Sequence, residues 1–341
     1  MHDHVKHAPM PGGWHDHSPA AGGDAGAAAL RGSVRCALDD RGYLEVTGAD
    51  AAAHLHGQLS SDITQLAPGD VRLSAYSDPK GRVLAVTRVI ADAGRFLLEL
   101  PAERLEPIRA QLTKYALRAD VRIRDTSETV ARFGVAGENA AVALAGVAGP
   151  LPEVLGTSRQ APGGARVFRV EGPRPRWTAL GPADAIASLW SALDAHAVTA
   201  DASAWRLLEI EAGMPIVEDE MVGRYVAQML NLDRLAAIDF RKGCYPGQEV
   251  IARARYLGRV KRRTYVLRTT GADAPQRGAA VLREDGSPVG EILYAAPHPD
   301  GGALALAVLQ TGAAGQSLRL TDAHGPAAEA RTPPYALEEA A

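Results

Sequence analysis

The sequence predicts an α+β protein built from more than one domain. In residues 34–125, segments that alternate apolar and polar residues, as strands do, are interleaved with helix-like segments. Residues 126–200 follow the order strand–helix–strand–strand–helix, which resembles a split βαβ unit. From Val260 onward, short strand-like segments alternate with turns, as in a small antiparallel barrel. A chain of 341 residues is long enough for two or three such domains.

The first region is predicted to contain five strands and two helices. Thr47 and Asp50 have the spacing of a capping box, which predicts a helix over residues 49–59. A second helix is predicted over residues 101–115, where apolar residues recur on one side. Strands are predicted at residues 42–48, 71–78, 82–90, 95–100 and 120–125, and a Pro-Lys-Gly turn joins the second and third as a hairpin.

The remaining segments follow from the same periodicities. In the second region the strands are predicted at 129–137, 165–170 and 176–180, and the helices at 138–147 and 183–196. A helix over residues 201–215 is predicted to be capped by Asp201 and ended by Gly213 and Pro215. Residues 1–33 are rich in His, Gly and Ala and have little to bury, so they are predicted to be a disordered tail.

The composition of the chain indicates which binding partners and which cellular compartment to expect. The formal net charge is −3, so overall charge favours neither nucleic acid nor a membrane surface. Two cysteines do not make a disulfide framework for a chain of this length. Apolar runs stay well below the ~18 residues of a spanning helix, and the N-terminus lacks the apolar stretch of a secretory signal. We expect a cytoplasmic protein without a membrane segment.

The stretch Lys-Gly-Cys-Tyr-Pro-Gly-Gln-Glu, residues 242–249, is the strongest candidate for chemistry. Gly243 and Gly247 permit a tight loop that leads into a short helix, and this places Cys244 near a helix N-terminus. A helix N-terminus and nearby cations such as Lys242 lower the pKa of a thiol. A free cysteine is also often a buried small hydrophobe, so both interpretations remain open. Without a nearby CxxC, no zinc or other metal site is predicted.

A basic run follows this motif over residues 253–263. Its cations could bind phosphates or a polycarboxylate ligand, or form a solvated surface. His56, in the helix predicted over residues 49–59, is interpreted as structural or pocket-lining rather than as a metal ligand, and Asp62 as a candidate to face the ligand site.

The motif resembles the signature of the YgfZ-type folate-binding proteins, relatives of the glycine-cleavage T-protein. That signature runs Lys-Gly-Cys-aromatic-x-Gly-Gln-Glu, and residues 242–249 match it, with Pro246 where relatives usually have Thr or Ile. The segments 46–63, 77–85, 114–123, 205–215 and 228–235 and the terminal Pro-Pro-Tyr-Ala-Leu-Glu-Glu resemble the family in the same order. The resemblance covers the chain from about residue 34 to its end.

The resemblance implies a three-domain, T-protein-like ring with a ferredoxin-like middle domain, a C-terminal antiparallel β-barrel and a central folate-binding hole. Residues 34–125 and 201–258 would form a discontinuous N-terminal domain, residues 126–200 the middle domain and residues 259–341 the barrel domain. The ligand implied is tetrahydrofolate, as a polyglutamate.

The resemblance also implies site residues. The motif carries over onto Lys242, Gly243, Cys244, Tyr245, Gly247, Gln248 and Glu249, with Cys244 and Lys242 as the candidate chemical groups.

Five further positions are candidate folate contacts. Trp205 matches a tryptophan that contacts folate in the family. A second such tryptophan of some relatives corresponds here to Arg41, with Tyr43 as the nearest aromatic residue. Arg253 and Arg259, in the basic run, are candidates to contact the folate carboxylates.

The residues and the resemblance suggest three candidate functions. The first is a folate-binding accessory protein for the assembly, maintenance or repair of iron–sulfur enzymes, which would support tRNA modification indirectly. Its partners would be folate and iron–sulfur client enzymes or assembly factors, and we expect a monomer that does not bind tRNA directly. The second is a folate-dependent aminomethyltransferase of the glycine-cleavage type, which the cysteine signature argues against. The third is RNA binding through residues 253–263.

Overall fold

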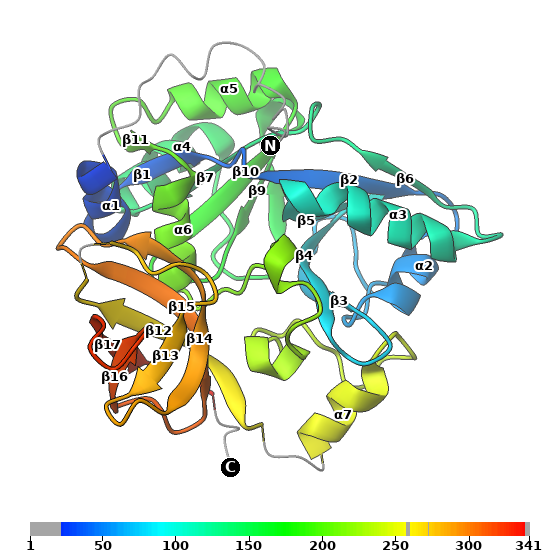
Figure 1. Cartoon of the computed structure of the whole chain (residues 1–341). Coiled ribbons are helices and arrows are strands. Elements are labelled where there is room, and N and C mark those ends of the chain that lie inside the picture. Colours follow the sequence, from blue (N-terminus) through cyan, green and yellow to red (C-terminus); the bar gives the residue numbers. More distant parts are fainter. Residues whose placement is uncertain (1–21, 257–259, 272, 338–341) are drawn as a thin grey trace, which may run out of the picture.

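The structure, a computed structural model, describes residues 22–256, 260–271 and 273–337. Two β-sheets and one closed barrel make up the fold, and helix α6 (Ala202–Glu211) lies at their junction (Figure 1). Asp201 caps this helix by accepting a hydrogen bond from the Ser203 amide at 3.0 Å, as the sequence predicts. Within the described residues, no helix is both long enough and apolar enough to span a bilayer.

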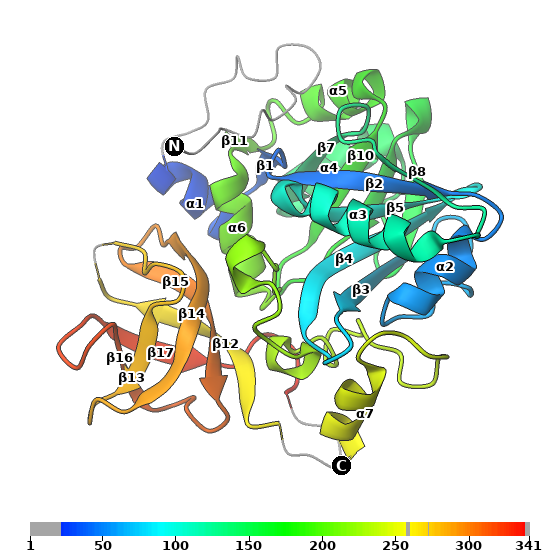
Figure 2. The same ribbon diagram turned by 45° about the vertical axis from the view of Figure 1, so that its right-hand side comes forward.

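The five-stranded sheet is antiparallel throughout. Its spatial order is β3 (Val71–Ser77), β4 (Val83–Asp92), β5 (Arg95–Pro101), β2 (Arg41–Thr47) and β6 (Arg122–Asp125). Its outer face is covered by α2 (Ala51–Gln58) and by α3 (Leu105–Ala116), which follows the 3₁₀ turn Ala102–Arg104 (Figure 2). Leu55, Ile108 and Leu112 pack against the strands there, so this face is a closed core.

The six-stranded sheet lies beside the first. Its order is β11 (Val198–Ala200), β1 (Val34–Ala37), β7 (Ala131–Ala136), β10 (Arg176–Gly181), β9 (Arg166–Arg169) and β8 (Ser158–Gln160), with only the β1–β11 pair parallel among these neighbours. Helices α4 (Glu138–Ala148) and α5 (Ala183–Ser191) cover one face, and a 3₁₀ turn spans Pro162–Gly164. The other face packs on α6.

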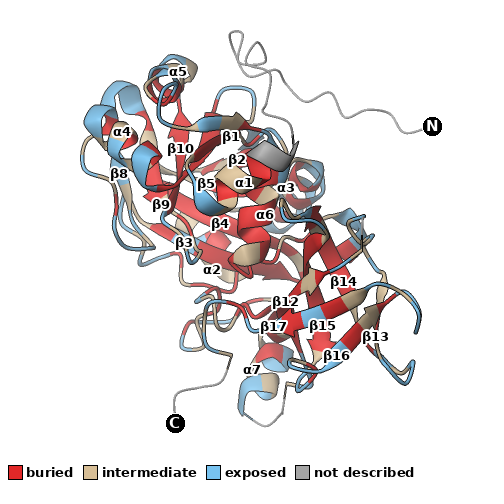
Figure 3. Ribbon diagram, turned by 90° about the vertical axis from the view of Figure 1, so that its left-hand side faces the viewer, coloured by how far each residue is buried: buried red, intermediate tan, exposed pale blue. Residues whose placement is uncertain are grey.

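The barrel follows α6 and three short helical segments. These are the 3₁₀ turns Asp219–Met221 and Ala227–Leu230 and helix α7 (Gln248–Tyr256). The barrel closes in the order β12 (Arg262–Thr269), β15 (Ala303–Gln310), β14 (Pro288–Pro297), β13 (Ala280–Arg283), β16 (Ser317–Leu320) and β17 (Ala327–Arg331). A continuous core joins barrel residues such as Leu306 to Leu207 and Ile210 of α6, so α6 is largely buried (Figure 3).

The structure differs from the prediction at the N-terminal end of the chain. Residues 22–31, assigned to a disordered tail, form helix α1 (Gly22–Arg31). Ala25 and Ala29 are buried against the core that contains α6, because small alanine side chains let two helices approach closely. Arg31 then forms an ion pair with Asp300 of the barrel at 2.8 Å. Residues 1–21 lie outside the described residues.

Two further predictions differ from the structure. β1, grouped with residues 34–125, pairs with β7 and β11 in the six-stranded sheet. The capping box does not form, because Thr47 ends β2 and the Asp50 carboxylate accepts a hydrogen bond from the Asp120 amide at 2.8 Å instead. A long-range contact therefore replaces the local one.

The packing of α1 is tested by placing a charged side chain at a buried position of this helix. We expect Ala29→Asp to lower the free energy of unfolding by about 3 kcal/mol, because it buries a carboxylate without a partner. Ala27→Asp, at a half-buried position of the same helix, is the matched control. Urea denaturation measures both variants, and equal midpoints would contradict the packing of α1 on the core.

Candidate functional site

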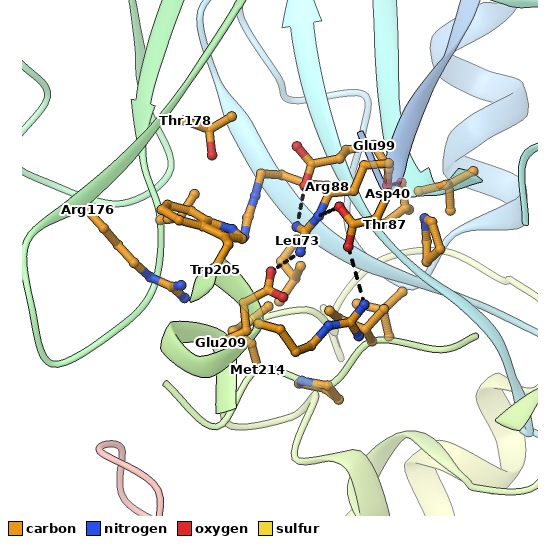
Figure 4. Close-up of a pocket in the computed structure, with 18 residues that line it drawn as sticks. Asp40, Leu73, Thr87, Arg88, Glu99, Arg176, Thr178, Trp205, Glu209 and Met214 are labelled. Carbon is orange, nitrogen blue, oxygen red and sulfur yellow. Dashed lines mark hydrogen bonds and ion pairs between the residues drawn. The ribbon is translucent and has the colours of Figure 1, made fainter. Parts of the chain in front are cut away.

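A pocket lies where the two sheets meet α6. The empty space between its walls, open solvent included, is about 630 Å³. Arg176, Trp205 and Glu209 line one side, and Asp40 and Glu99 line the other (Figure 4). The hairpin strands contribute Leu73 and residues 86–88, and the chain after α6 contributes residues 214–216. The pocket therefore collects segments from five separate parts of the sequence.

Buried charges dominate this pocket. Arg41 forms an ion pair with Glu209 of α6 and a second with Glu99 of β5 at 3.3 Å. Burial by itself would raise the pKa of Glu209, but Arg41, Arg206 and Arg176 hold it below its usual value. Glu209 is therefore a carboxylate at neutral pH.

Arg176 is the most deeply buried cation of the pocket. Burial lowers its pKa to about 10, with Arg88 and Arg41 acting in the same direction and Glu209 and Glu171 opposing them. Arg176 therefore remains charged at neutral pH. Its guanidinium carbon lies 5.1 Å from the ring centroid of Trp205, a distance at which the ring face attracts a cation.

Trp205 is a wall of the pocket rather than an open platform. It is only 2% exposed. A Cβ at Gly134 of β7 would lie 2.6–2.8 Å from three of its ring carbons, so only glycine allows this ring to lie against the strand. The indole therefore fixes α6 on the sheet and supports the Arg176 guanidinium.

Several buried polar atoms of the pocket have no hydrogen-bond partner among the described residues. They are Asp40 Oδ1, Glu209 Oε2, Arg88 Nε, Arg176 Nη1 and Arg206 Nη1. An unsatisfied buried donor or acceptor costs about 1–3 kcal/mol. Donors and acceptors that face one cavity are suited to a ligand that carries both kinds of polar group.

The Lys-Gly-Cys loop forms a second cluster, at the C-terminal end of α2. Lys242 is 8% exposed. Its Nζ donates to the carbonyl oxygens of His56, of Leu59 at 2.6 Å and of Ser61 at 3.2 Å. Burial lowers the pKa of Lys242 to about 8, while Asp62 and Asp239 oppose this shift. At neutral pH the ammonium thus supplies three donors, one to a carbonyl of the last turn of α2 and two to carbonyls of the residues that follow it.

The glycine at position 247 ties this loop to the tip of the β3–β4 hairpin. Gly247 has φ +79°, and a Cβ there would lie 2.5 Å from both the Asp78 carbonyl oxygen and Gly81 Cα. A Cβ at Gly81 would in turn lie 3.0 Å from Val250 Cβ. The start of α7 is therefore packed directly on the hairpin tip.

Comparison with known proteins identifies the family. No protein-family model matches the chain. The tRNA-modifying protein YgfZ of Escherichia coli O157:H7 (strain EC4115 / EHEC) is 32% identical over 269 residues, which are 77% of this chain and 81% of that protein. The protein of the same name from Escherichia coli (strain K12) is 30% identical over 307 residues, 89% of this chain and 93% of the other. The chain belongs to the YgfZ family.

The fold agrees with that of a solved structure. The structure of glycine cleavage system aminomethyltransferase T from Bartonella henselae is similar with a TM-score of 0.73, at 17% identity, over 88% of this chain and 85% of that chain. Identity this low shows the fold alone. The predicted α+β, T-protein-like fold with a C-terminal antiparallel barrel is confirmed.

The candidate YgfZ residues separate into two places. Arg41 and Trp205 line the pocket, and no residue of the motif 242–249 does. Tyr43 does not line it either: its ring is buried in the core behind the pocket, and its hydroxyl donates to Glu99 Oε2 at 2.9 Å. Arg253 is exposed on α7, 3.6 Å from Glu249. Arg259 lies outside the described residues.

The Lys242 side chain was expected to act on the Cys244 thiol, but it is bonded to backbone carbonyls instead. Its Nζ is directed to the backbone of α2, and Tyr245 lies beside it with the ring centroid 5.0 Å away. Cys244 is exposed, whereas Cys36 is buried. No group of three or more His, Cys, Asp and Glu side chains suited to a metal ion occurs in the described part of the chain.

Sequence reasoning missed the charged residues of the pocket other than Arg41. Arg88 is a cation inside a mostly apolar strand, and Glu209 lies one helical turn after Trp205. Both patterns were visible signals of buried charge. Arg176 directly precedes a strand-like apolar run and carries no such signal.

The loop contact is tested with two glycines of the motif. We expect Gly247→Ala to lower the free energy of unfolding by about 2 kcal/mol, because a positive φ and a backbone clash coincide there. Gly243→Ala is the control, since its Cβ would have only an ordinary contact, 3.6 Å from His56 Nε2. Thermal or urea unfolding of both variants decides the matter, and a harmless Gly247→Ala would refute the close approach.

Proposed function

We propose that this YgfZ protein binds tetrahydrofolate, as a polyglutamate, in the pocket beside α6. The observation that carries the proposal is the set of buried polar atoms there without a hydrogen-bond partner in the described structure, two carboxylate oxygens and three guanidinium nitrogens. A pterin is flat and has adjacent N–H donors and a carbonyl acceptor on one edge. Glu209 Oε2 is suited to the donors and an arginine N–H to the acceptor.

The charge of the pocket also suits the rest of this ligand. The glutamyl part of a folate carries carboxylates, which guanidinium groups bind in a planar, bidentate manner. Arg88 and Arg206 line the pocket and each keeps a nitrogen without a partner in the described structure. The apolar side chains of Leu73, Val86 and Met214 supply the surface that an aromatic ring system needs.

We further propose that the protein acts in the cytoplasm as an accessory factor for iron–sulfur enzymes. Two relatives carry the name tRNA-modifying protein. Modification by an iron–sulfur enzyme that depends on this factor would account for that name without direct tRNA binding. Cys244 is the group proposed to act on the client, because its side chain is exposed on a loop that Lys242 and Gly247 hold in place.

Folate binding is tested at Glu209, the carboxylate that is proposed to accept hydrogen bonds from the pterin. We expect Glu209→Gln to weaken tetrahydrofolate binding by roughly thirtyfold, because a charged hydrogen bond contributes about 2 kcal/mol. Anaerobic calorimetric titration measures the affinity. Glu211→Gln, two residues along the same helix and outside this pocket, is the matched control.

The outcomes separate the proposals. Equal affinity in Glu209→Gln and Glu211→Gln, with both variants folded by circular dichroism, would place the ligand elsewhere. Turnover of an aminomethyl carrier by the folate-loaded wild type would instead establish the aminomethyltransferase alternative.

The role of Cys244 is tested in a deletion strain that depends on the protein for the activity of an iron–sulfur client. We expect Cys244→Ala to remain folded and to bind tetrahydrofolate as the wild type does, since Cys244 does not line the pocket. Client activity should fall severalfold in extracts of the complemented strain. Cys36→Ala is the comparison, because that thiol is buried. Full client activity with Cys244→Ala would exclude the thiol from the function.

A further inference from the structure

A histidine–carboxylate pair lies beside the loop that carries Cys244. His56 is in the last turn of α2, and its Nδ1 is 2.9 Å from Asp62 Oδ1. Asp62 Oδ1 also accepts hydrogen bonds from the Thr64 amide at 2.9 Å and from the Thr64 hydroxyl at 2.7 Å. Both side chains of the pair are largely shielded, with 20% of His56 and 24% of Asp62 exposed.

These contacts determine which nitrogen of His56 accepts a proton. Burial opposes the charge of Asp62, but its hydrogen bonds from Thr64 and the nearby His56 keep its pKa below the usual value. Asp62 is therefore ionised and can only accept, so Nδ1 carries the hydrogen. In the neutral ring Nε2 is then the acceptor, and the hydrogen bond found for the His56 ring in the described structure is the one at Nδ1.

The acceptor nitrogen faces the loop. His56 Nε2 lies 3.6 Å from the point that a Cβ of Gly243 would occupy, so the absent side chain leaves the ring open toward the loop backbone. Cys244 is the next residue, about 3.8 Å away from Cα to Cα. Its side chain is exposed and makes no hydrogen bond in the described structure. The bonds of Lys242 Nζ to the carbonyls of His56, Leu59 and Ser61 hold the loop at this end of α2.

We infer that His56, oriented by Asp62, is the proton acceptor that activates the Cys244 thiol. In this step the Sγ–H bond breaks and an Nε2–H bond forms, while the electron pair stays on sulfur. The products are a thiolate and an imidazolium whose other N–H still donates to Asp62. The step needs no further reactant. It rests on the proposed role of Cys244, and hydrogen bonds of this kind are often formed only in a working complex.

The charged surroundings favour the ion pair. Lys242 and Asp62 are the charged groups bonded to this end of α2. Asp239 acts on Lys242 from the start of the loop, and Glu249 begins α7 as an exposed acid that lies 3.6 Å from Arg253. The carboxylate of Asp62 stabilises an imidazolium, and an imidazolium stabilises a thiolate beside it, whereas the Lys242 ammonium is directed to backbone carbonyls. The reactivity of Cys244 should therefore depend on the protonation of His56.

Alkylation by iodoacetamide, followed by mass spectrometry across a pH series, tests the inference on the full chain. In His56→Gln we expect the rate at neutral pH to fall about tenfold, because the thiol loses its proton acceptor. The difference from the wild type should shrink as the pH rises, because hydroxide then removes the thiol proton without His56. Asp62→Asn should fall in the same direction by a smaller factor. His196→Gln, an exposed histidine on another domain, is the matched control.

The pH series separates activation from simple damage to the loop. Above the pKa of an ordinary thiol the variants should alkylate as fast as the wild type, whereas a distorted loop would be slow at every pH. Cys244→Ser measures the background from buried Cys36. A His56→Gln profile that coincides with the wild type would overturn the inference. If Cys244→Ala nevertheless abolishes client support, the proposed function stands without this proton acceptor.

Discussion

The ion pair between Arg41 and Glu209 is the contact on which the pocket depends. It joins the first residue of β2 to the middle of α6, and Glu99 of β5 extends it. Removing one partner of a buried pair leaves an uncompensated charge and costs about 3–5 kcal/mol. Replacing both partners with apolar groups is often neutral, so the pair is better explained by the site than by stability. It holds a carboxylate and a guanidinium in fixed orientation next to a cavity.

α6 connects this pair to the rest of the molecule. Trp205 lies flat against Gly134 of the six-stranded sheet, while Leu207 and Ile210 reach the core shared with the barrel. Tyr294 of the barrel donates its hydroxyl to the Met214 carbonyl, just after this helix. One helix thereby positions a pocket wall against two sheets and a barrel.

The pocket and the Cys244 loop are separate, but one hairpin reaches both. Leu73 of β3 and residues 86–88 of β4 line the pocket, whereas the hairpin tip at Gly81 packs on Gly247 and Val250. The hairpin is a pair of hydrogen-bonded strands, so one continuous element contacts both places.

Most elements and the barrel could be predicted without coordinates, because alternation, helical periodicity and turn residues act locally. The loop of Cys244 could also be located through its glycines. The packing of α1 and the direction of the Lys242 side chain, in contrast, depend on long-range contacts. The tertiary structure also showed that the motif lies outside the pocket. The pocket could not be derived locally, since Arg41, Arg88, Arg176 and Glu209 are brought together by sheet pairing and by the packing of α6. The local patterns around Arg88 and Glu209 indicate a buried charge, but the partner of each charge is a property of that packing.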